Sequence, residues 1–134
     1  MIKKILAAID GSEHAWKALD LATDLAKLHG AQLTVLHVMP YEPMAEALRA
    51  FAAAENLPLE EEAEARVRDQ GLADVVGRTV EGKPADCILE LAKSEHVDMI
   101  VMGSRGLSDA RALFLGSVSH KVANLAACTC VTVK

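Results

Sequence analysis

Short apolar runs alternate along this chain with longer segments in which apolar residues recur at helical spacing. The first run, residues 2–9, is apolar on both faces after its first positions, as expected for a strand buried in a parallel sheet. Residues 12–29 repeat apolar side chains at helical spacing, with Ser12 placed as the N-cap and Gly30 as the residue that ends the helix. This alternation predicts an α/β domain.

The rest of the chain continues the same alternation. An apolar run at 32–39 precedes an Ala- and Glu-rich helical stretch that reaches residue 70 and is divided into two pieces near 56–58. The run 73–80 is interrupted by a glycine and an arginine, which predicts a strand near an edge of the sheet. The remaining predicted elements are a helix over 85–95 preceded by Pro84, a strand over 97–102, a loop over 103–116, a helix over 117–126 and a strand over 129–133.

Length and composition narrow the class of protein. The 134 residues favour one domain, 1–134, and the net charge of −5 with only 3% aromatic residues argues against nucleic-acid binding. No apolar stretch approaches the roughly 20 residues of a membrane span, so we expect no membrane insertion. Three cysteines are too few and badly spaced for a disulfide framework, and no cleavage signal is evident, so we expect a cytoplasmic location.

Glycines between a buried strand and a helix mark the main candidate for chemistry. Gly103, Gly106 and Gly116 would let backbone N–H groups approach an anion, and the helix that begins near Ser117 adds the positive end of its dipole. The hydroxyls of Ser117 and Ser119 are further donors. Phosphate is the natural ligand, although the same residues also fit a flexible, solvated loop.

Two further features favour the phosphate interpretation. Arg105 and Arg111 place cationic charge in the same loop of an acidic chain. Asp10 lies at the carboxyl end of the first strand, where it could accept hydrogen bonds from a base or ribose, or cap the following helix together with Ser12. These features converge only if the first and fourth strands are neighbours at the switch point of the sheet.

The motif A-x-D-G-S after the first strand, L-H-V in the second and G-x2-G-x9-G-S near the end resemble the nucleotide-binding branch of the universal stress protein family. The resemblance covers essentially the whole chain. It implies an open five-stranded parallel sheet of order 3-2-1-4-5 with helices on both faces, an adenine nucleotide alpha hydrolase-like fold. It also implies a homodimer formed through the last strand and ATP bound at the ends of strands one and four. The chain departs from the family at Thr129, in a C-T-C sequence, where a proline is common.

The resemblance also assigns parts of the site to positions of this chain. It implies an adenine pocket, a ribose site and a phosphate site. Their residues are, respectively, Ala8, Ile9, Asp10 and Val38; Met102 and Gly103; and Gly106, Gly116, Ser117 and Val118, with Arg105 nearby. Mg²⁺ would be carried by the phosphates of ATP.

These observations predict a dimeric, ATP-binding regulator of the stress response whose nucleotide occupancy controls a regulatory protein partner that the sequence does not identify. No general base stands beside the glycine loop, so we do not expect an enzyme, although slow ATP hydrolysis remains an alternative. A nucleotide-independent interaction module is the other alternative. An AMP-forming ligase or an electron-transfer flavoprotein subunit has a similar core, but the chain is too short for either.

Other patterns are interpreted as structural. Residues 77–83 have the glycine and lysine spacing of a P-loop, but a proline follows the lysine and Gly77 falls inside an apparent strand. Cys128 and Cys130 share one face of a strand, which is more typical of packing than of a metal or redox site. His37 is expected to be a core imidazole, and the glutamates of 60–64 a solvated start of a helix.

Overall fold

The computed structural model describes residues 1–39, 58–106 and 116–134. In these ranges five strands form one parallel sheet in the order β3-β2-β1-β4-β5, which confirms the predicted topology. The strands are β1 (Lys4–Ile9), β2 (Gln32–Met39), β3 (Val75–Glu81), β4 (Met99–Gly103) and β5 (Thr129–Val133). The helices are α1 (Glu13–His29), α3 (Leu59–Asp69), α4 (Pro84–Ser94) and α5 (Ser117–Leu125).

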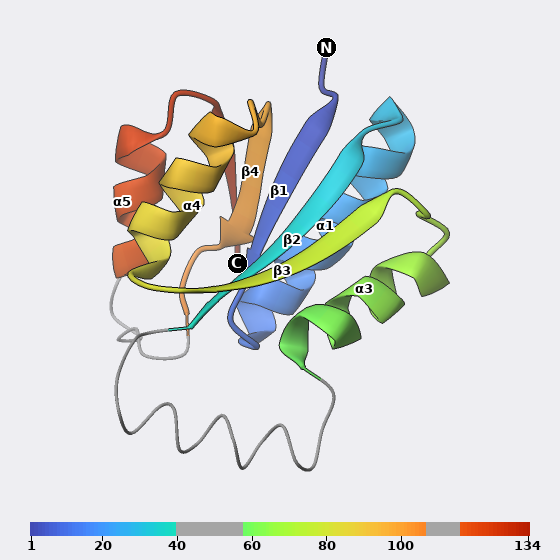
Figure 1. Ribbon diagram of the computed structural model, residues 1–134, viewed down its shortest axis with the longest axis horizontal. Coiled ribbons are helices and arrows are strands. Elements are labelled where there is room, and N and C mark those ends of the chain that lie inside the picture. Colours follow the sequence, from blue (N-terminus) through green and yellow to red (C-terminus); the bar gives the residue numbers. More distant parts are fainter. Residues whose placement is uncertain (40–57, 107–115) are drawn as a thin grey trace.

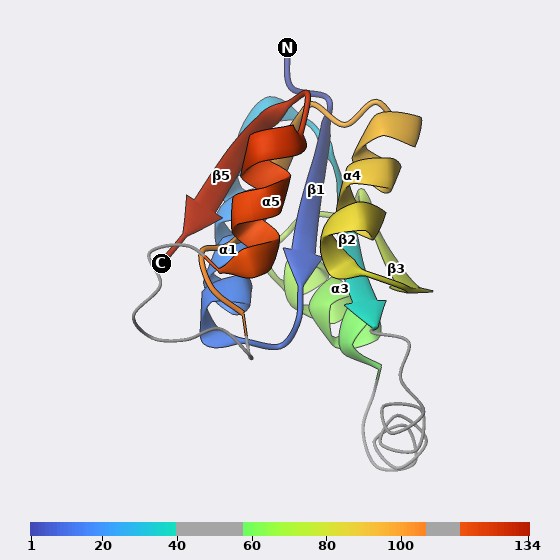
Figure 2. The same ribbon diagram turned by 90° about the vertical axis from the view of Figure 1, so that its left-hand side faces the viewer.

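The sheet lies between two layers of helices (Figure 1). Helices α1 and α3 cover one face, and α4 and α5 cover the other, where Figure 2 shows them in front of the sheet. Each face has its own aliphatic core, because alternate residues of the buried strands point to opposite sides. In β1, Ile5 belongs to the core under α1 and Leu6 to the core under α4, and both are fully buried.

Helix α1 begins and ends where its sequence predicts. Ser12 has an extended backbone, and its Oγ accepts a hydrogen bond of 3.3 Å from the Ala15 N–H. At the other end Gly30 has φ of 65°, the left-handed conformation that glycine adopts without steric cost.

Several strand boundaries differ from those predicted by apolar runs. β1 starts at Lys4, and the N–H groups of Lys3 and Lys4 donate to the Asp98 carboxylate at 2.8 and 3.0 Å. These hydrogen bonds lower the pKa of Asp98. β4 accordingly begins after Asp98, at Met99, and extends to Gly103. The second helical piece before residue 70 is α3, whereas the first lies outside the described residues.

The P-loop-like segment is structural, as predicted, and one glutamate has a structural role that the sequence analysis missed. Gly77 lies within the edge strand β3, and its N–H donates to the carboxylate of Glu64 on α3. The same carboxylate pairs with Arg68 at 2.9 Å. A carboxylate in contact with the Gly77 amide excludes phosphate from that position, and Glu64 is therefore not simply solvated.

Gly103 sets how closely α1 approaches the end of β4. A Cβ atom at this position would lie 2.8 Å from the Cβ of His14 and 2.9 Å from its carbonyl carbon. The contact includes backbone, so it cannot be relieved by rotating a side chain. Only glycine allows the first turn of α1 to lie against this end of the sheet.

We predict that Gly103→Ala lowers the free energy of unfolding by about 1 to 3 kcal/mol, the usual cost of overpacking. Gly30→Ala is the control, because its added Cβ meets no atom within 4 Å and reports only the cost of a left-handed backbone. Urea denaturation measures both variants. A Gly103→Ala variant as stable as the wild type would contradict the close approach.

Candidate functional site

A cavity of about 270 Å³ opens at the carboxyl ends of β1 and β4. Strand order reverses between these two strands, because β2 and β3 continue from β1 in one direction and β5 continues from β4 in the other. Ala8 of β1 pairs with Met102 of β4 at this point. The cavity therefore occupies the switch point at which open α/β sheets bind ligands, and its volume is near the lower end of the usual range of about 300 to 1,000 Å³.

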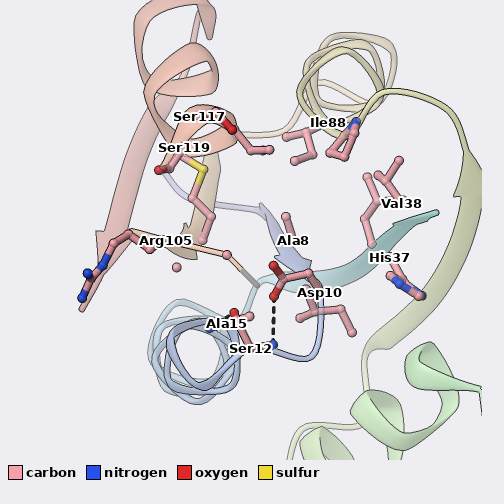
Figure 3. Close-up of a pocket in the computed structure, with 17 residues that line it drawn as sticks. Ala8, Asp10, Ser12, Ala15, His37, Val38, Ile88, Arg105, Ser117 and Ser119 are labelled. Atoms are coloured by element: carbon pink, nitrogen blue, oxygen red, sulfur yellow. Dashed lines mark hydrogen bonds between the residues drawn. The ribbon is translucent and has the colours of Figure 1, made fainter. Parts of the chain in front are cut away.

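One half of the cavity is apolar. Its side chains come from the core under α4 and α5 and belong to β1, β2, β4 and α4: Ala8, Leu36, Val38, Ile88 and Met102. Figure 3 shows Val38 and Ile88 on one side of the opening and Ala8 at its back. Ile9 also borders the cavity, but its side chain packs in the other core under α1, so it offers the site its backbone.

The other half is polar and is built from the starts of two helices. Asp10 precedes α1, and Ser12 is the N-cap of that helix. Ser117 and Val118 are the first two residues of α5, on the opposite side. Gly103, Arg105 and Gly106 join these parts along the end of β4. Helix α5 begins at Ser117, and the positive end of its dipole makes this end of the cavity suited to an anion.

Asp10 has a structural contact as well as a place in the cavity. Its Oδ1 accepts a hydrogen bond of 2.9 Å from the Ser12 N–H, the dashed line in Figure 3. This contact fixes the turn that leads from β1 into α1, with Gly11 at φ of 85° between them. Both predicted roles of Asp10, support of the helix start and exposure to a ligand, are therefore geometrically compatible.

Ser104, inside the glycine motif, directly follows β4, and its hydrogen bonds connect β4 with α1, β5 and the start of α5. It is 1% exposed, and its Oγ lies 3.0 Å from Nδ1 of His14 on α1. Its N–H donates to the carbonyl of Val133 at the end of β5, at 2.7 Å. Its carbonyl accepts the Gly116 N–H at 2.6 Å and the Ser119 hydroxyl at 2.7 Å, both at the start of α5.

These bonds correct two predicted phosphate contacts. The Gly116 N–H donates to Ser104, and Gly116 is the N-cap of α5 beside the cavity rather than one of the residues that line it. The Ser119 hydroxyl has one proton, which it directs to the Ser104 carbonyl, so it is not a donor to a ligand. Ser117 and Val118 do line the cavity, as predicted.

The structure describes one of the two arginines of the loop. Arg105 lines the cavity with its backbone end, but its side chain extends away from the centre in Figure 3. Arg111 lies outside the described residues. Backbone N–H groups and the helix dipole are therefore the main features at the α5 end of the cavity that could attract an anion.

His37 borders the cavity from β2 and is half-buried. Burial lowers its pKa below the ordinary 6.5, and the nearby carboxylates of Glu60 and Asp10 oppose this shift. The imidazole is therefore neutral at neutral pH. Figure 3 shows its ring turned away from the centre of the cavity, and His37 lies at the edge of the cavity rather than in the core that was predicted for it.

The sequence analysis missed several residues of the site. Leu36, Pro84 and Ile88 line the cavity, and the helical pattern of α4 could have indicated the last two, since α4 must cover the same face of the sheet as α5. Ser104 had no such signal, because it occupies a variable position of the glycine motif and its partners are distant in the sequence.

Fold and site together define an open parallel α/β domain with a ligand cavity at its switch point. The family model of the universal stress protein family matches residues 1–134, so the chain belongs to that family. A relative from Thermus aquaticus, "Universal stress protein in QAH/OAS sulfhydrylase 3'region", is 40% identical, and the match covers 100% of both chains.

Solved structures agree with this assignment. The protein MJ0577 is 30% identical and superposes with a TM-score of 0.84 over 100% of this chain and 96% of its own. A universal stress protein in complex with cAMP is 28% identical, with a TM-score of 0.79, and the match covers 98% of this chain and 97% of that one. Among the described residues of this chain, no helix is long and apolar enough to cross a membrane.

We predict that Ser119→Ala lowers the free energy of unfolding by about 1 kcal/mol, because it removes a buried hydrogen bond to the Ser104 carbonyl. Ser117→Ala, two positions earlier on the exposed side of α5, should change stability by less than about 0.5 kcal/mol. Chemical denaturation of both variants tests the difference. Equal losses would show that the Ser119 bond adds nothing to the anchoring of α5.

Proposed function

We propose that this universal stress protein binds an adenine nucleotide, ATP with Mg²⁺, in the cavity at the switch point. The main support for this proposal is that one cavity joins an apolar half to the N-terminus of α5 through a segment of small residues. A base requires the first feature and phosphates the second. The relative that is described in complex with cAMP supports an adenine nucleotide as the ligand class.

The two halves suggest how the ligand would be oriented. The base would lie against Val38 and Ile88, within reach of the Asp10 carboxylate, which can accept a hydrogen bond from the adenine amino group. The phosphates would point towards Gly106 and the first turn of α5. The described residues contain no group of three or more His, Cys, Asp or Glu suited to a metal, so Mg²⁺ would be held chiefly by the phosphates.

We further propose that the protein is a cytoplasmic regulator rather than a dedicated enzyme. Hydrolysis would need a group that orients or deprotonates water beside the terminal phosphate. Among the described residues, Asp10 lies at the base end and the His37 ring turns away from the cavity. Nucleotide occupancy would then act through what the bound protein recruits, a regulatory partner of unknown identity. Slow ATP hydrolysis and a nucleotide-independent interaction module remain the alternative functions.

We predict that nucleotide-stripped protein binds MgATP at micromolar concentration and MgGTP at least about tenfold more weakly, because guanine presents a carbonyl where adenine presents its amino group. Asp10→Asn should weaken MgATP binding on the order of tenfold or more. Asparagine keeps an oxygen that can accept the Ser12 N–H, so this variant separates ligand binding from the start of α1. Isothermal titration measures each affinity.

Asp24→Asn is the matched control, since Asp24 is exposed on α1 and does not line the cavity. It should bind MgATP like the wild type. Absence of MgATP binding to the wild type would favour the nucleotide-independent interaction module. Turnover of ATP by the wild type at ordinary enzyme rates, about 1 per second or faster, would overturn the proposal of a regulator.

We also propose that the protein forms a homodimer through β5. This strand is the last one in the sheet, so in a single chain one row of its backbone groups has no neighbouring strand. Val131 and Val133 add half-buried apolar side chains at this edge. A twofold pairing of two such edges would satisfy both rows.

We predict a mass in solution of twice the 14.3 kDa of one chain. Light scattering coupled to gel filtration at micromolar concentration measures it. Thr132→Pro, which removes one backbone N–H from β5, should shift the protein towards a monomer. A wild-type mass of one chain would contradict the homodimer.

A further inference from the structure

Two thiols lie together at the outer margin of the sheet, away from the nucleotide cavity. Cys128 directly precedes β5 and Cys130 is its second residue, and neither lines the cavity. Both side chains pack against the core under α4 and α5, together with Val118 and Ala126. Figure 2 shows β5 as the outer strand, beside α5. Both cysteines are free and partly exposed, so reagents in solution can reach them.

The two cysteines lie close together along the strand, and their side chains pack against the same core. The Cys130 Sγ lies 3.7 Å from the carbonyl oxygen of Cys128, which places it back towards the preceding cysteine. Burial raises the pKa of both thiols. The Asp98 carboxylate at the start of β4 is near enough to raise the pKa of Cys128 as well.

We propose that Cys128 and Cys130 form a binding site for one soft, thiophilic metal ion, Cu(I), held by the two sulfur atoms of a single chain. Thiolates favour soft metal ions such as Cu(I), and they also bind zinc and iron–sulfur clusters. The site uses a face of β5 and leaves the backbone edge of the strand available for pairing. It does not depend on the nucleotide cavity or on the proposed function.

The number of donors decides which metal fits. A structural zinc site needs four ligands, and the described residues contain no group of three or more His, Cys, Asp or Glu placed to hold a metal. Mg²⁺ and Ca²⁺ require several oxygen ligands. Cu(I) has a filled d shell and accepts two thiolates in a near-linear arrangement, so a dithiol alone is a sufficient site for it.

Binding is an exchange of protons for metal and involves no oxidation. Two S–H bonds break, two Cu–S bonds form, and both protons pass to the solvent. A dithiol of zero charge and one Cu⁺ ion thus give a bis-thiolate complex of charge −1 and two protons. Because binding releases two protons, the affinity for Cu(I) should rise as the pH is raised.

The experiment is an anaerobic titration of the full chain with Cu(I) in competition with a chromogenic chelator. We expect one Cu(I) per chain for the wild type, and a loss of affinity of at least tenfold for Cys128→Ser and for Cys130→Ser. Cys87→Ser is the matched control, because Cys87 lies alone on α4 with its Sγ 3.9 Å from the Glu81 carbonyl oxygen. This variant should bind Cu(I) like the wild type.

A second probe tests the spacing of the thiols independently of copper. Phenylarsine oxide bridges two neighbouring thiols, so it should add once to the wild type and to Cys87→Ser and not to the other two variants, as measured by intact mass. Circular dichroism and thermal unfolding confirm that each variant is folded. Undiminished Cu(I) binding in either Cys128→Ser or Cys130→Ser, or a ratio of one ion to two chains, would overturn the site within one chain.

Discussion

The packing of the first turn of α1 against the end of β4 is the contact on which the rest of the site depends. Gly103 allows it, because a side chain there would overlap the backbone of His14. The close approach brings His14 within 3.0 Å of the Ser104 Oγ and places Asp10 opposite the start of α5. A larger residue at Gly103 would therefore displace the start of α1, and with it Asp10, from the end of β4 as well as reduce stability.

Sequence patterns predicted most of the strands and helices, and three strands and one helix show why. Strands β1, β2 and β4 are apolar on both faces because helices cover the sheet on both sides, and this requirement leaves long apolar runs. Ser12 marks the start of α1 and Gly30 marks its end. Each acts through residues that are close to it in the sequence, so a short segment of sequence is enough to predict it. The position of the site followed from the strand order, since parallel strands present their carboxyl ends on one side.

What the sequence could not predict depends on partners that are far apart along the chain. The Gly116 N–H was expected to face a phosphate but donates to Ser104, and Ser119 does the same with its hydroxyl. Ile9 follows a pocket residue in the sequence, yet the alternation of the strand sends its side chain to the opposite core. Glu64 seemed to be part of an exposed acidic run until the fold placed it beside the Gly77 amide.

Ser104 also connects the glycine motif to the last strand, β5, through hydrogen bonds. A single buried residue donates to Val133 of β5 and accepts from the two residues, Gly116 and Ser119, that fix the start of α5. Each of these bonds is short, and all lie where water cannot replace a lost partner, so displacing one would leave a buried polar group unpaired. Ser104 therefore joins the start of α5, at the polar end of the cavity, to β5, the strand through which we propose that two chains pair.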